Sequence, residues 1–224
     1  MNFIQSFIDM LFIGVITLFP VVNPIGSAFI VNPYLSNLEI REKRKAVKKI
    51  ALYAFILCTI ALFAGHWILE IFGITIPVVQ LAGGIMICKI GWEFLSSDKK
   101  EAKADVDEEG NTLSSNYSLI QDKLFYPITF PITTGAGSIS VLFTLSAHSA
   151  NAHINLYLIN TGAILLAIIV ICSLIYFFYL NTKKIIRVIG KEGEQILNRI
   201  MAFLIFCVGL QIGITGIKHL FNIQ

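Results

Sequence analysis

Two short stretches of the chain place glycine, hydroxyl and amide residues within apolar sequence. They are Phe19–Phe29, which reads F-P-V-V-N-P-I-G-S-A-F, and Phe130–Ser140, which reads F-P-I-T-T-G-A-G-S-I-S. The free N–H groups and positive dipole end at a helix start favour a carboxylate or another anionic group. Asn, Ser and Thr side chains add neutral donors and acceptors, and glycine lets the backbone approach a ligand closely. The stretches therefore predict a binding site for a small polar solute. Its candidate residues are Asn23, Pro24, Gly26, Ser27, Thr133, Thr134, Gly135, Gly137 and Ser138.

An internal duplication relates the two stretches. Their alignment pairs Pro20 with Pro131 and Gly26 with Gly137, at a constant offset of 111 residues. Each proline removes a backbone donor and clashes with the carbonyl four residues earlier, so a regular helix cannot continue unchanged. One such segment alone is more often a simple kink. Matching breaks in two halves of a chain, however, are typical of the solute site of a transporter.

The rest of the chain indicates an all-α membrane protein. Hydrophobic residues make up 56% of it and charged residues 14%, against roughly 25% charged residues in soluble domains. Several uncharged runs reach the length of about 18 residues that spans a bilayer. The expected transmembrane helices cover about 8–31, 46–69, 72–95, 124–147, 155–180 and 199–219. The first and fourth of these six helices would be broken near mid-membrane.

Basic residues predict the orientation, because Lys and Arg concentrate in cytoplasmic loops. They gather after the first, third and fifth helices, whereas the N-terminus and the loops after the second and fourth helices have none. Both termini are therefore predicted outside, and the two halves run in opposite directions. The result is a 3+3 inverted repeat: residues 1–95 form the first three-helix repeat and 123–224 the second. Residues 96–122 are expected to be a flexible cytoplasmic linker. A weaker match sets Gln80–Cys88 against Arg199–Cys207.

The basic segment after the first helix carries a helix-start signal. Ser36 followed three residues later by Glu39 predicts a capping box that begins the second helix. The basic residues that follow are expected to form a solvated helix end at the membrane surface rather than a specific lipid or nucleic-acid site.

Ionisable residues are missing from the middle of every expected span. A carboxylate proton relay inside the membrane is therefore not expected. No cofactor is predicted; coupling to Na⁺, through carbonyls and hydroxyls, or to H⁺ remains open. Cys58, Cys88, Cys172 and Cys207 form no CxxC pair and are expected to be small buried residues, not metal ligands. His66, His148, His153 and His219 fall at the outer side as interfacial polar residues. No catalytic motif is present, so an enzyme is not expected.

The motifs resemble the MarC family of bacterial inner-membrane proteins. The residues that carry the resemblance are Asn23-Pro24-Ile-Gly26, Phe72-Gly-Ile, Ala82-Gly-Gly-Ile85 and Phe130–Ile139, and the match extends over all six expected spans. The resemblance implies a multi-pass protein of the bacterial inner membrane. Some relatives are classed as neutral amino-acid transporters, and much of the family is uncharacterised.

These observations predict a secondary transporter or exporter of small neutral or zwitterionic solutes such as amino acids. The alternative is a non-transporting membrane scaffold or a subunit of an envelope complex. The expected partners are the lipid bilayer and a small solute. Nucleic acid is not an expected partner, and a homo-oligomer remains open.

Overall fold

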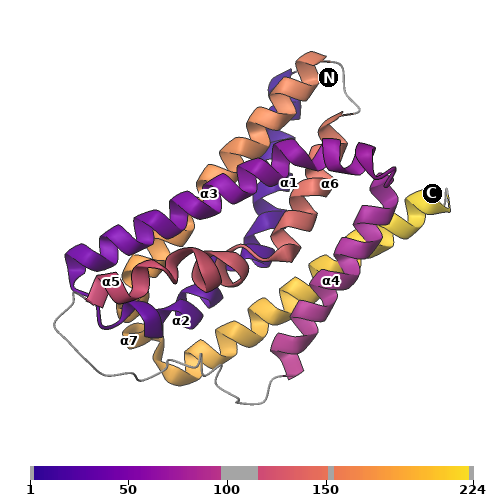
Figure 1. Cartoon of the computed structure of the whole chain (residues 1–224). Coiled ribbons are helices and arrows are strands. Elements are labelled where there is room, and N and C mark those ends of the chain that lie inside the picture. Colours follow the sequence, from indigo (N-terminus) through magenta and orange to yellow (C-terminus); the bar gives the residue numbers. More distant parts are fainter. Residues whose placement is uncertain (1–2, 97–115, 151–153, 222–224) are drawn as a thin grey trace.

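The computed structural model describes residues 3–96, 116–150 and 154–221, and all regular structure in these ranges is helical. Figure 1 shows the helices gathered into one bundle, with the N- and C-termini far from α2 and α5. The helices in chain order are α1 (Phe3–Val22), α2 (Pro24–Leu35), α3 (Ile40–Ile71), α4 (Ile76–Ser96), α5 (Asn116–Gln121), the π-helix η1 (Leu124–Thr133), α6 (Ala136–Ala150) and α7 (Ile154–Leu220).

Within the described residues, five helical segments are long and apolar enough to cross a membrane, or six if η1 and α6 form one bent span. They cover Phe3–Leu35, Ile40–Gly65, Ile76–Glu93, Ile154–Val188 and Ala202–Leu220. The prediction of an all-helical protein with several membrane spans is confirmed.

The fifth and sixth predicted spans are the two parts of α7. This helix is interrupted at Gly190, whose φ of 72° lies in the region that favours glycine. The connection between the fifth and sixth predicted spans is therefore helical before and after Gly190. Figure 1 shows the two parts of α7 as separate arms, the second of which ends at the C-terminus.

The start of α3 differs from the predicted capping box. Glu39 is the N-cap residue, and its backbone N–H donates to the Glu42 carboxylate at 3.3 Å. Ser36 has helical φ and ψ of −67° and −32° at the end of α2, and its hydroxyl donates to the Pro33 carbonyl at 3.2 Å. An N-cap needs extended backbone, which Ser36 does not have. The prediction that Ser36 caps this helix was therefore wrong.

The predicted linker, 96–122, lies mostly outside the described residues. Six residues near its end, Asn116–Gln121, form α5. Ile120 is buried in the main core, and the Lys49 ammonium lies 5.6 Å from the centre of the Tyr117 ring. These contacts attach the end of the linker segment to α3.

The second part of α7 packs closely along α4. A Cβ added to Gly84 would lie 2.6 Å from the Gly213 Cα and 2.7 Å from the Gly209 carbonyl oxygen. Small residues at such an interface let two helix backbones approach in a membrane. The first part of α7 packs on α1, where Gly14 faces Ala167, and α3 packs on α6, where Gly65 faces Phe143. This arrangement leaves α6 between α1 and α4.

Candidate functional site

The first of the two sequence motifs interrupts the helix at one residue. Asn23 has φ 45° and ψ 64°, and its side chain accepts a hydrogen bond of 3.0 Å from the Gly26 N–H. Ser27 donates its hydroxyl to the Asn23 carbonyl at 2.7 Å. Pro24 takes the first helical position, where its missing N–H costs nothing. A Cβ at Gly26 would lie 2.8 Å from Asn23 Cγ, so glycine leaves the room that this cap needs.

The second motif bends the chain more strongly. Leu124–Thr133 and Gly137–Ser146 meet at an angle of 67°. Tyr126 and Phe130 have extended φ and ψ inside η1, each directly before a proline, as expected for a residue in that position. The Thr133 hydroxyl donates to the Ile128 carbonyl at 2.7 Å, which adds a side-chain bond within η1.

Tyr179 of α7 joins the two motifs inside the bundle. Its side chain is fully buried, its hydroxyl lies 2.8 Å from Thr133 Oγ1, and it also faces the Ser27 side chain. Because the hydrogen of Thr133 is already donated to Ile128, Tyr179 is the donor toward Thr133. Tyr179 thus lies near Ser27 of the first motif and is hydrogen-bonded to Thr133 of the second, 106 positions further along the chain.

Two further hydroxyl groups of the second motif are buried without a hydrogen-bond partner among the described residues. They are Thr134 Oγ1 and Ser138 Oγ, whose residues are 0% and 1% exposed. The Cys58 thiol neighbours Thr134 without reaching hydrogen-bond geometry. A buried hydroxyl without a partner is costly, so these two groups are candidates for contact with water or solute.

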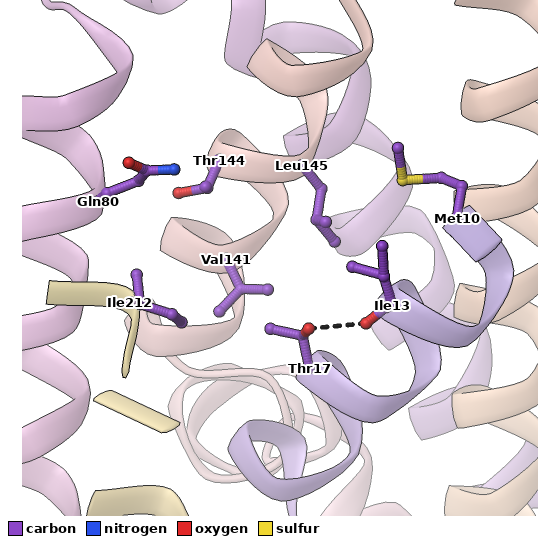
Figure 2. A pocket seen from close by; sticks show the side chains of 8 residues that line it. All are labelled: Met10, Ile13, Thr17, Gln80, Val141, Thr144, Leu145 and Ile212. Carbon is purple, nitrogen blue, oxygen red and sulfur yellow. Dashed lines mark hydrogen bonds between the residues drawn. The ribbon is translucent and has the colours of Figure 1, made fainter. Parts of the chain in front are cut away.

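A pocket of about 190 Å³ lies elsewhere, between α1, α4, α6 and α7 (Figure 2). None of the nine predicted site residues lines it. The lining residues are Met10, Ile13, Thr17, Gln80, Val141, Thr144, Leu145 and Ile212. On α6, Ser138 precedes the lining residue Val141 by three residues. It therefore lies about one helical turn from the pocket, on the same face of the helix.

Gln80 supplies the amide group of this pocket. It is 3% exposed, and its Oε1 lies 3.2 Å from His219 Nδ1. An amide oxygen only accepts, so His219 carries the hydrogen on Nδ1 in this pair. Figure 2 shows the Gln80 amide nitrogen directed toward the Thr144 hydroxyl.

Seven of the nine predicted site residues are buried, whereas Asn23 and Gly135 are partly exposed. Ser27 and Thr133 meet at Tyr179, whereas Asn23 and Gly26 bond to each other in a helix cap. Tyr179 was not predicted, because one tyrosine in an aromatic-rich apolar run has no distinguishing sequence pattern. The lining residues of the pocket were not predicted either, since they come from four helices whose packing the sequence does not give.

The four cysteines are free thiols that lie within helices. Cys58 neighbours Cys172, and Cys88 neighbours Cys207. The Cys88 thiol also contacts the Phe206 carbonyl at 3.6 Å. In the described part of the chain, no group of three or more His, Cys, Asp or Glu residues could hold a metal ion.

The sequence matches a family model described as MarC family integral membrane protein over residues 8–221. The chain belongs to the MarC family. It is 27% identical over 216 residues to the inner membrane protein MarC of Citrobacter koseri, covering 93% of this chain and 94% of that protein. It is 26% identical over 213 residues to the proteins of the same name from Escherichia coli and Shigella flexneri, with the same coverage. No solved structure matches the chain. This MarC family member is a multi-pass inner-membrane protein.

Proposed function

We propose that this MarC family member is a secondary transporter, or exporter, of small neutral or zwitterionic solutes such as amino acids. The observation that carries the proposal is the meeting of the two duplicated motifs inside the bundle. Ser27 of the first motif and Thr133 of the second face the same Tyr179 hydroxyl. Interrupted helices from two halves of a chain form the solute sites of many transporters, near the middle of the membrane.

A 3+3 inverted repeat with mid-membrane breaks belongs to the proposal. In such a repeat, equivalent positions of the two halves approach each other at the two-fold axis between them. Cys58 and Cys172, from the second helices of the two halves, lie near each other, and so do Cys88 and Cys207 from the third helices. Cys88 and Cys207 also stand opposite each other in the match of Gln80–Cys88 with Arg199–Cys207. This proximity supports the inverted arrangement of residues 1–95 and 123–224.

The helix starts at the two motifs provide the chemistry. The first turn of α6 carries N–H groups that have no acceptor within the helix, with the positive dipole end beside them. At the start of α2, Pro24 has no N–H and the Gly26 N–H is donated to Asn23, so that end contributes mainly its dipole. The N–H groups at the start of α6 suit the carboxylate of a zwitterion. The unpartnered hydroxyls of Thr134 and Ser138 lie at the start of α6 and would bind the polar part of the same solute.

The predicted orientation agrees with the gathering of basic residues at one end of the bundle. Lys183 Nζ donates to the Ser36 carbonyl at 2.6 Å, and Lys43 lies near Lys183. The end of α2, the basic start of α3 and the basic segment of α7 around Lys183 therefore lie together, as the positive-inside rule requires of a cytoplasmic surface. With this end in the cytoplasm, both termini would be outside.

Flux measurements in proteoliposomes test the proposal. Purified protein should take up a labelled amino-acid mixture, and imposed Na⁺ and H⁺ gradients would identify the coupling ion. Asn23→Leu and Gly137→Leu should reduce uptake strongly, whereas Gly162→Leu should not, because nothing lies within 4 Å of a Cβ at Gly162. Normal uptake by both motif variants would refute the site assignment.

The alternative, a scaffold or a subunit of an envelope complex, is favoured by one observation. Ser27, Thr133, Thr134 and Ser138 are each at most 3% exposed, as in a packed structural core. A scaffold would show no flux for the native protein and would copurify with a defined membrane partner. Flux that depends on the motif residues excludes it.

A further inference from the structure

The pocket between α1, α4, α6 and α7 is separate from the residues of the two motifs. We propose that it binds a small uncharged solute, or the uncharged aliphatic part of a larger one, and that Gln80 recognises a hydrogen-bond acceptor on it. Only the movement of this solute across the membrane rests on the proposed function. Its binding in the pocket does not, because binding is measurable without transport.

The charge of the occupant follows from the lining. All eight lining side chains are uncharged, and five of them are aliphatic or thioether groups. A carboxylate or ammonium group would lose its hydration here without gaining a partner of opposite charge, and that cost is large. The pocket therefore selects against ions.

The polar groups of the lining define what the occupant must offer. Thr17 donates its hydroxyl to the Ile13 carbonyl at 2.6 Å, and Thr144 donates to the Ser140 carbonyl at 3.1 Å. Both hydroxyls keep lone pairs that accept hydrogen bonds. The Gln80 oxygen is held by His219, which leaves the amide N–H groups to donate. A matching occupant carries one acceptor for Gln80 and a donor for the threonines, as a primary amide or an alcohol does.

The size of the pocket limits the occupant further. Its volume of about 190 Å³ corresponds to about six water molecules at about 30 Å³ each and lies below the roughly 300–1,000 Å³ of pockets for drug-sized ligands. A lipid chain would fit the aliphatic walls but would leave the Gln80 amide without an acceptor. A branched group of a few carbons with one amide or hydroxyl fits both the space and the polar atoms.

Three leucine-sized probes test this chemistry: 4-methylpentanamide, which is neutral; 4-methylpentanoate, which is an anion; and 4-methylpentylamine, which is a cation. Val141→Cys, which keeps all three polar side chains of the lining, is made in full-length protein whose four native cysteines are replaced by alanine. A membrane-impermeant thiol reagent then labels it in oriented vesicles, from each side in turn. Ile16→Cys, at an exposed position next to Thr17 on α1, is the lipid-facing control.

The amide should protect Val141→Cys, and the two ions should not. At a concentration about ten times the dissociation constant, the amide leaves about a tenth of the pockets free, so labelling slows about tenfold. Adding Gln80→Leu removes one hydrogen bond to the probe and should weaken protection about two- to tenfold. Gln211→Leu changes an exposed glutamine of α7 and should leave protection unchanged.

Two results would overturn the proposal. Absence of labelling from either side, in folded protein, would mean that lipid or side chains fill the pocket. Equal protection by the amide and the two ions, or by none of them, would mean that Gln80 and the threonines do not select the occupant. Protection without flux by the native protein would refute the transport proposal but not the pocket proposal. Flux without protection would refute the pocket proposal but not the transport proposal.

Discussion

The hydrogen bond between Tyr179 and Thr133 should couple α7 to the second motif. Tyr179→Phe removes one buried hydroxyl and its 2.8 Å bond to Thr133, at a cost of about 1 kcal/mol of unfolding free energy. Thr133→Val removes this bond and the 2.7 Å bond to the Ile128 carbonyl, so its cost should be about 1–2 kcal/mol. Tyr176→Phe, at an exposed tyrosine of the same helix, should cost less than about 0.5 kcal/mol.

A double-mutant cycle isolates the contact between the two side chains. Unfolding free energies would be measured by titrating detergent-solubilised protein with a denaturing detergent, for native protein, both single variants and the double variant. Double-mutant cycles in a helical membrane protein give coupling energies of about 0.6 kcal/mol on average and about 1.7 kcal/mol at most. We expect a favourable coupling in this range. A coupling of zero within error would refute the reasoning that Tyr179 holds the second motif.

Three further outcomes are expected. Gly84→Ala should lower the unfolding free energy by about 1–3 kcal/mol through overpacking, because its Cβ would lie 2.5–2.7 Å from backbone atoms of α7. The control Gly162→Ala should not lower it, since nothing lies within 4 Å of a Cβ at Gly162. Equal costs for the two variants would contradict the close contact of α4 with α7. Gly26→Ala should displace the Asn23 side chain and reduce solute uptake in proteoliposomes, and unchanged uptake would show that this cap is not required for function. A cysteine at Gln5 should react with an impermeant reagent only from outside, and one at Lys184 only from the cytoplasm; the reverse pattern would overturn the predicted orientation.

The helical membrane fold was accessible to sequence reasoning. Long uncharged runs have few alternatives to helices in a bilayer, because every backbone polar group must be bonded internally. The change in backbone at Asn23 and the 67° bend before α6 occur at the proline- and glycine-rich motifs. Their depth in the membrane remains a prediction.

Features that depend on packing between distant segments could not be predicted. Tyr179 differs from the exposed Tyr176 and Phe177 in being buried against Thr133, which the sequence does not indicate. The pairing of Gln80 with His219 depends on how α4 lies along α7. The error at Ser36 has a local cause: α2 continues to Leu35, so the serine closes one helix instead of opening the next. A spacing of three residues between Ser and Glu does not distinguish these cases.

Cysteine accessibility at the two motifs tests the central claim most directly. Asn23→Cys and Thr134→Cys would be made without the native cysteines and treated with an impermeant thiol reagent from each side, with and without an amino-acid mixture. Thr134 is fully buried in this structure, so labelling would require a second conformation that admits water. A transporter predicts labelling at both positions that the solutes shift or prevent. No labelling from either side, in folded protein, would contradict the transport account and favour a packed scaffold.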